Sequence, residues 1–347
     1  MRNYLYRSSI AFIVTLLLTN ALVSAQEPTG GGSLVRDLSG GAALIFRSPN
    51  NPTVHLVVQT GGSGGGRLTG HRTPPPPVMK RQEQAIAKAN EARSAPKPRF
   101  SEAEQQYQLA ARIAPDDARS FAGLGNVYVD QQRFGEAVDA YQQALKVEPQ
   151  YTAVLMPLAF SLARLNRYAE SIDVYNQALK QDTQNPELLN NLGYAYNHSE
   201  RYDDAVDVCK QAIALLGATG QAYAMGFQER NEVLSQAYKN LGNAYNGLKR
   251  YEDAAEILKQ AAQIEPTNAA AHFNLGLTLY NAGRFSEAIE AYKEVIKLRP
   301  TLAQAHFNLG LTYLAINDQK AAMGEYEALK SISPDLAQRL YGSIKPH

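Results

Sequence analysis

One pattern of residues returns about every 34 positions along the chain, and it constrains the fold more than any other feature. In its clearest copy, residues 118–151, the pattern reads Leu124-Gly125, Tyr128, Ala137 and Tyr141. A fixed period of this length is typical of stacked helical hairpins, so we expect an all-α solenoid rather than a globular enzyme core. The pattern begins again at Leu158, Leu192, Leu241, Leu275 and Leu309.

Each unit reads as two short helices. Apolar residues recur at helical spacing over 121–131 and again over 135–147. Gly125 and Ala137 are small enough for the two helices to approach closely, and Pro149 ends the second helix because it cannot continue one.

These residues resemble the tetratricopeptide repeat family, whose pattern combines a Leu-Gly pair, aromatic residues, two small alanines and a closing proline. The resemblance implies a right-handed α-solenoid of about six to seven hairpins, with a degenerate first unit. Some positions depart from the family pattern. They are Ala159 in place of glycine, Ser171 in place of alanine, Cys209 in place of an aromatic residue, and Thr183 and Gly217 in place of proline. The implied array spans 78–347, with units near 84–117, 118–151, 152–185, 186–219, 235–268, 269–302 and 303–336 and a capping helix over 337–347.

An insertion over 220–234 interrupts the period. It either lengthens the first helix of the next unit from about Phe227 or lies over the groove of the array. The helix extension is the favoured alternative.

The N-terminus has the features of a secretory signal peptide over residues 1–25. Arg2 and Arg7 precede the apolar run 10–18, and small residues end at Ala25, where we expect cleavage. The alternative is an uncleaved anchor, for which the apolar stretch is short. We therefore expect a periplasmic or secreted protein without an integral membrane span after cleavage.

Residues 26–77 form a leader rich in Gly and Pro, which we expect to be mostly disordered. Two β-like runs, 42–46 and 54–59, could pair as a short hairpin or add to the sheet edge of a partner.

The charge is divided along the chain. Residues 1–98 carry 11 Lys and Arg against 4 Asp and Glu, and the rest of the chain is acidic. This modest division does not indicate nucleic-acid binding. The single cysteine, Cys209, excludes an intrachain disulfide and is expected to be a buried apolar residue.

The resemblance implies that one side of the first helices lines an inner groove that binds a protein or peptide. An asparagine recurs at one position of four units and resembles the asparagine ladder in the repeat domain of O-GlcNAc transferase. Lys239, Asn243 and Asn274 match part of the carboxylate clamp of chaperone-binding repeats, whereas Gln304 and Asn308 stand where that clamp has cations. The predicted groove residues are Asn191, Asn240, Asn274, Asn308, Lys239, Asn243, Tyr194, Phe273, Leu277, Phe307 and Leu311.

Each of these interpretations has a structural alternative. The asparagines could bond within the array, and Phe273, Phe307, Leu277 and Leu311 could pack against the capping helix. His272 and His306 occupy the same position in adjacent units, where the family has a large packing residue, so we expect packing rather than metal binding.

The sequence contains no spacing typical of a catalytic or cofactor site, so we expect no enzymatic activity and no cofactor. The predicted function is a scaffold that binds an extended peptide or a partner helix outside the cytoplasm. Two alternatives remain: an envelope assembly component that docks on a membrane complex through its convex face and leader, and a regulatory or substrate-selecting subunit of a separate enzyme.

Overall fold

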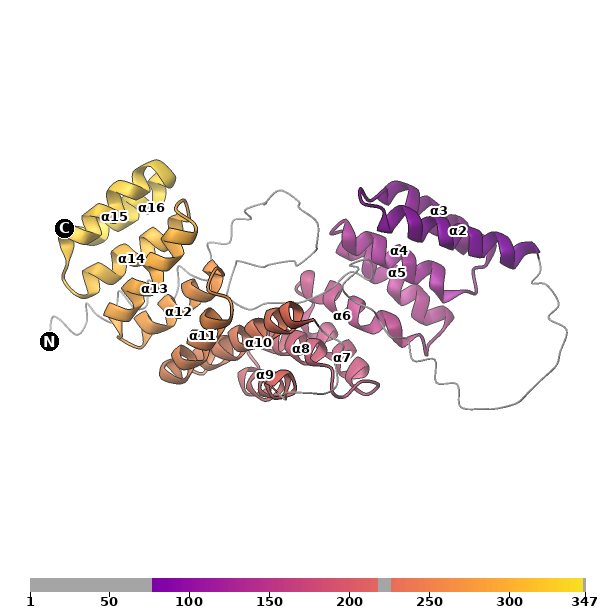
Figure 1. The fold of residues 1–347 in the computed structure, drawn as a ribbon, viewed down its shortest axis with the longest axis horizontal. Helices are drawn as coiled ribbons and strands as arrows, with labels where there is room; N and C mark the ends of the chain where they lie inside the picture. Colours follow the sequence, from indigo (N-terminus) through magenta and orange to yellow (C-terminus); the bar gives the residue numbers. More distant parts are fainter. Residues whose placement is uncertain (1–76, 218–225, 346–347) are drawn as a thin grey trace.

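The computed structural model describes residues 77–217 and 226–345, and all regular structure within these ranges is helical. Seven helical hairpins follow one another in single file along an arch, with α2 and α3 at one end and α15 and α16 at the other (Figure 1). The predicted α-solenoid is therefore confirmed. The hairpins are α2 (Pro77–Ser94) with α3 (Phe100–Ile113), α4 (Ala118–Asp130) with α5 (Phe134–Val147), α6 (Leu155–Arg164) with α7 (Tyr168–Leu179), α8 (Pro186–His198) with α9 (Tyr202–Gly217), α10 (Phe227–Gly247) with α11 (Tyr251–Ile264), α12 (Ala269–Asn281) with α13 (Phe285–Leu298), and α14 (Ala303–Ala315) with α15 (Gln319–Ile332).

In the central hairpins the first helix lies toward the inside of the arch. Figure 1 shows α6, α8 and α10 on the inner side, with α7 and α9 below them on the outer side. A short 3-10 turn, η1 (Thr152–Val154), leads into α6.

Glycines on the first helices allow the second helices to pack closely. A Cβ added to Gly125 would lie 2.4 Å from Tyr141 Cε1, so the tyrosine ring fills the space that a side chain would need. Tyr141 and the small Ala137 and Ala144 are all fully buried. The residues that define the sequence repeat thus form the contact between the two helices of a unit.

A residue with positive φ joins the two helices of each unit from α4 onward. It is the second residue after the first helix, and in one unit it is a glycine, Gly283, with φ of 76°. In the other units a residue other than glycine adopts this left-handed backbone conformation, which costs conformational free energy. The other residues are Gln132, Asn166, Glu200, Lys249 and Asn317, with φ between 58° and 64°.

Two departures from the family pattern have a local explanation. Ser171 stands where other units have alanine, and its hydroxyl donates to the carbonyl of Ala159 at 2.7 Å. Cys209 replaces an aromatic residue, and its sulfur lies 2.4 Å from the position that a Cβ on Gly193 would take. Both side chains are fully buried, as predicted for the cysteine.

The boundaries differ from the prediction at both ends of the array. The first helix, α2, begins at Pro77, which the prediction had assigned to the leader. At the other end, Pro334 does not only close the last unit: it is the first residue of α16 (Pro334–Ile344), so the cap begins before residue 337. Proline suits this position because its missing N–H would have no helical partner there.

The predicted signal peptide (1–25) and the leader as far as residue 76 lie outside the described residues. The β-like runs 42–46 and 54–59 belong to that part of the chain.

The insertion lengthens α10, as predicted. This helix begins at Phe227 and has 21 residues, and its added turns rest on α9. Arg230 Nε donates to the carbonyl of Leu216 at 2.6 Å, and Val233 is buried against Leu216. Residues 218–225 of the insertion lie outside the described residues.

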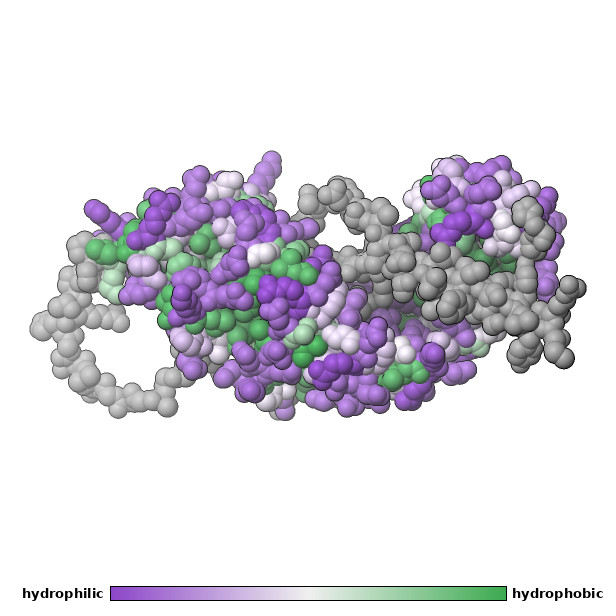
Figure 2. Space-filling model, turned by 180° about the vertical axis from the view of Figure 1, so that it is seen from behind, coloured by the Kyte–Doolittle hydropathy of each residue, from purple (hydrophilic) through white to green (hydrophobic). Residues whose placement is uncertain are grey.

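The face of the array seen from behind is mainly hydrophilic (Figure 2). In the view from behind, hydrophobic residues gather in small, separate patches among hydrophilic ones (Figure 2). Among the described helices, none combines the length and apolar composition that a membrane crossing needs.

Candidate functional site

Polar residues of α8 and α10 meet at the centre of the arch. On α10, Gln236, Lys239, Asn243 and Asn246 follow one another at intervals of three or four residues and therefore share one face of the helix. We call the corresponding face of all first helices the inner face. On α8 it carries Asn190, Tyr194, Asn197 and His198, and on α6 it carries Phe160 and Arg164.

Asparagine side chains join α8 to α10 at this point. Asn240 Nδ2 donates to Asn190 Oδ1 at 2.9 Å and lies 3.2 Å from the main-chain oxygen of the same residue. Asn190 Nδ2 donates to Asn191 Oδ1 at 3.2 Å, and Asn197 Nδ2 donates to the carbonyl of Asn240 at 2.8 Å. The bonds between Asn240 and Asn190 and between Asn197 and Asn240 cross the boundary between two units where the insertion breaks the sequence period.

The predicted asparagine row lies with one member on each of α8, α10, α12 and α14, and all four side chains are buried. Asn308 accepts a hydrogen bond from Gln304 Nε2 at 3.0 Å, and its own Nδ2 lies 3.5 Å from the Tyr292 hydroxyl. Asn191, Asn240 and Asn308 therefore bond within the array, while their use as a peptide ladder stays a prediction.

Aromatic rings stack beside the asparagines. The His198 ring lies parallel to the Tyr168 ring, with 4.9 Å between centroids and 13° between planes, and 4.3 Å from the Tyr194 ring. The repeat positions of the first helices predict Tyr194 as a groove residue but not Tyr168, because Tyr168 belongs to a second helix. The signal was present: an aromatic residue begins α5, α7, α9, α11 and α13.

The apolar anchors predicted near the C-terminus are part of the core. Phe307 and Leu311 are buried and belong to one hydrophobic cluster with Leu340 of α16. The guanidinium of Arg339 also lies over the Phe307 ring, 5.1 Å from its centroid. The prediction that Phe307 and Leu311 anchor a ligand is therefore wrong, because α16 packs against the surface that they would offer.

Phe273 and Leu277 are only partly buried. The Phe273 ring meets the Tyr292 ring edge-on at 5.9 Å, and Leu277 packs at the margin of the cluster beneath α16. These two side chains therefore keep some exposed surface on α12.

The partial carboxylate clamp lies on α10 and α12. Lys239 is buried, with 4% of its surface exposed, and Asn243 is half-buried on the same face of α10. Asn274, the third member, is buried on α12.

Several polar atoms of the inner face have no hydrogen-bond partner among the described residues. Asn246 illustrates the arrangement: its Nδ2 donates to Thr278 Oγ1 at 2.7 Å, but its Oδ1 is buried and without a partner. Of the seven such side-chain atoms in the described ranges, five belong to the inner face. They are Arg164 Nε, Asn197 Oδ1, Gln236 Oε1, Asn243 Nδ2 and Asn246 Oδ1.

Comparison with known families supports the identity of the repeated unit. Models of the tetratricopeptide repeat match residues 122–186, 157–223, 246–291 and 303–336, and a further TPR repeat model matches 279–317. The chain is an array of tetratricopeptide repeats.

Solved structures share this fold. A tetratricopeptide repeat protein from Parabacteroides merdae ATCC 43184 has a TM-score of 0.55 at 17% identity, over 75% of this chain and 97% of that chain. PilF of Pseudomonas aeruginosa has a TM-score of 0.52 at 19% identity, over 66% of this chain and 97% of that chain. A chain of the APC/C hetero-tetramer Cut9-Hcn1 has a TM-score of 0.54 at 19% identity, over 67% of this chain and 43% of that chain. No curated protein matches the sequence significantly.

The two histidines fix the turns between tetratricopeptide repeats. His272 Nε2 lies 3.0 Å from the carbonyl oxygen of Pro266, and His306 Nε2 lies 2.9 Å from that of Pro300. His306 Nδ1 also lies 2.7 Å from Glu325 Oε2. Within the ranges that the structure describes, no group of three or more His, Cys, Asp or Glu residues could hold a metal ion.

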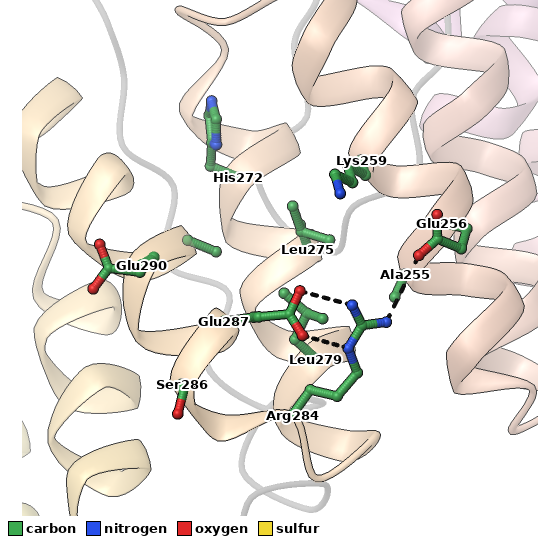
Figure 3. A pocket seen from close by; sticks show the side chains of 11 residues that line it. Ala255, Glu256, Lys259, His272, Leu275, Leu279, Arg284, Ser286, Glu287 and Glu290 are labelled. Carbon is green, nitrogen blue, oxygen red and sulfur yellow. Dashed lines mark hydrogen bonds and ion pairs between the residues drawn. The ribbon is translucent and has the colours of Figure 1, made fainter.

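An open pocket of about 480 Å³ lies between α11, α12 and α13 (Figure 3). Leu275 and Leu279 contribute apolar surface to it, and Arg284 crosses one side. Arg284 bonds Glu287 through two contacts of 2.7 Å and lies 3.8 Å from Glu256. The rim also carries Lys259 and Glu290, so the pocket offers an apolar floor and a charged rim with three acidic and two basic residues.

Proposed function

We propose that the repeat array is a protein-interaction scaffold whose inner face binds an extended polypeptide. The observation that carries this proposal is the set of five unpartnered polar atoms on α6, α8 and α10. A buried polar atom without a partner costs about 1–3 kcal/mol. A bound chain that supplies the missing partners recovers this cost.

The mixture of donors and acceptors favours a polypeptide backbone as the ligand. Arg164 Nε and Asn243 Nδ2 are donors, whereas Asn197, Asn246 and Gln236 each present a carbonyl oxygen. A main chain offers one N–H and one C=O at nearly every residue, so it can pair with both kinds of group. A phosphate backbone offers only acceptors and would leave the three carbonyl oxygens unpaired.

Capture of partners by paired variants tests this function. Asn243→Ala with Asn246→Ala removes two inner-face amides, and Gln260→Ala with Gln263→Ala removes two exposed amides from the outer helix α11. We expect the inner-face variant to lose partners that the wild-type chain and the outer-face variant retain in affinity capture followed by mass spectrometry. Equal capture by both variants, with unchanged helicity, would exclude the inner face.

We also propose that the chain works outside the cytoplasm. The support is the N-terminal order of Arg2 and Arg7, an apolar run and small residues up to Ala25. Fractionation of expressing cells and N-terminal sequencing of the mature chain test this point. A mature N-terminus at Gln26 is the expected result, and an intact Met1 in the cytoplasmic fraction would contradict it.

The pocket between α11, α12 and α13 supports a second proposal, in which the array docks on an assembly through its convex face. Its apolar floor between α11 and α13 is the surface for such a contact. Leu275→Gln would weaken outer-face docking and leave inner-face capture intact, whereas deletion of residues 26–76 would weaken docking through the leader.

A further inference from the structure

Arg164 is the last residue of α6, and its guanidinium is held against an aromatic ring. The guanidinium carbon lies 5.2 Å from the centroid of the Phe134 ring. Phe134 in turn meets Phe160 edge-on at 6.0 Å, and Phe160 is fully buried. The charge therefore lies over a packed aromatic pair at the inner face and is restricted in position before any ligand binds.

No carboxylate pairs with Arg164 among the described residues, although comparable arginines are paired. Arginines that precede the second helices bond an acidic residue three positions later, as Arg167 does with Glu170 at 2.6 Å and Arg201 with Asp204 at 2.8 Å. Asp130 is the last residue of α4, just as Arg164 is the last residue of α6. Its carboxylate already pairs with Arg93 at 2.5 Å. Arg164 is thus a half-buried inner-face cation with an unused planar set of donors.

From this arrangement we infer that the polypeptide bound on the inner face carries a carboxylate that pairs with Arg164. This inference rests on the proposed function and adds the chemical class of the ligand. A guanidinium fixed on a ring offers parallel N–H donors that match the two oxygens of a carboxylate. The buried Nε, which lacks a partner, is one of those donors.

The helix spacing sets the distance from the carboxylate to the rest of the contact. Packed helices lie about 8–10 Å apart, so α10 is about two such steps from α6. An extended chain advances about 3.3 Å per residue, so the acidic group lies about five or six residues from the segment over Asn243 and Asn246. A ligand of about ten residues therefore spans the site.

Synthetic peptide libraries test the inference with the full-length chain. Two libraries contain amidated peptides of about ten residues, with Glu fixed at one position in turn in the first library and Gln in the second. A third library has Gln and a free C-terminal carboxylate. Fluorescence anisotropy measures binding. We expect an acidic library to bind the wild-type chain roughly tenfold more tightly than its neutral counterpart.

Three variants identify the residue responsible. Arg164→Gln should abolish the preference for the acidic library, and Arg164→Lys should keep part of it because the charge remains. Arg167→Gln is the matched control, since it removes a nearby charge that Glu170 already pairs, and it should keep the full preference. Thermal unfolding by circular dichroism verifies that all three variants fold.

The outcomes separate this inference from the proposed function. A preference for the free C-terminus locates the carboxylate at the chain end, and a preference for fixed Glu locates it in a side chain. Both results support the inference. Binding without any acidic preference, or a preference that persists in Arg164→Gln, overturns it and leaves the scaffold function intact. Failure of every library to bind overturns the proposed function itself.

Discussion

Leu340 of the capping helix lies directly against Gly310 of α14. A Cβ at residue 310 would lie 2.5 Å from Leu340 Cδ2 and 2.9 Å from Cδ1, and Leu340 is fully buried. The absence of a side chain on Gly310 is therefore what allows α16 to close the end of the array and cover Phe307.

We expect Gly310→Ala to destabilise the protein by about 1–3 kcal/mol, because the new methyl group forces the cap away from α14. Gly324→Ala is the matched control: it also lies within a helix, but its new Cβ would meet no atom within 4 Å. This control should gain about 0.5–1 kcal/mol from helix propensity. Urea unfolding followed by circular dichroism measures both, and equal effects would contradict the close contact.

Two residues with positive φ in equivalent turns, Lys249 and Gly283, give predictions of opposite sign for stability. Lys249 has φ of 58°, so Lys249→Gly should stabilise the chain by up to about 1 kcal/mol through the release of backbone strain. Gly283 occupies the same turn of the next unit with φ of 76°, and Gly283→Ala should destabilise by about 1 kcal/mol. Thermal unfolding compares the two variants. If both variants change the stability in the same direction, the left-handed backbone conformation does not determine the effect of these substitutions.

Cys209 should resist thiol reagents in the folded protein. Burial raises the pKa of its thiol, and the reactive thiolate is therefore scarce at neutral pH. We expect labelling by a disulfide reagent only after denaturation. In the control, Cys209→Ala with Ser331→Cys, the thiol lies at an exposed position and should react at once. Rapid labelling of the folded wild-type chain would contradict the burial.

Asp117 should make the first complete repeat sensitive to acid. The side-chain hydrogen bond from Arg119 is the main cause that lowers the pKa of Asp117 below its usual range. Because the folded pKa is the lower one, its contribution to stability is present above about pH 4 and is lost as the pH falls through the folded value. The Asp117 side chain is 19% exposed, but its partner Arg119 is 52% exposed, so solvent screening keeps this contribution small.

Asp117→Asn isolates this charge, since asparagine caps a helix as well as aspartate does. The wild-type chain should be the more stable of the two at pH 7, and the difference should shrink between pH 5 and pH 2. A difference that does not change with pH would show that the charge contributes nothing.

Most of the fold could be predicted from residues that recur at regular spacing. The glycine and aromatic residues of each unit, such as Gly125 and Tyr141, meet because both recur at fixed offsets on adjacent helices. The longer α10 could also be predicted from the insertion, because its residues continue a helical pattern from Phe227.

The inner face could be predicted only in part. The spacing identified Asn240, but its bonds to Asn190 depend on how α10 packs on α8 after the insertion. Tyr168 contacts His198, and Arg164 contacts Phe134; in each pair the two residues belong to different helices. The residue pattern of a single helix does not show a contact between two helices.

The amino-acid sequence by itself determined that this chain is a row of helical hairpins, because local periodicity decides which residues of a helix are buried. Only the tertiary structure decided which inner-face side chains keep surface that a ligand can contact. Phe307 and Leu311 have the same local character as Phe273 and Leu277, but they lie beneath α16, whereas the earlier pair keeps some exposed surface. Exposure depends on which neighbour packs against a surface, and that neighbour is distant in the sequence.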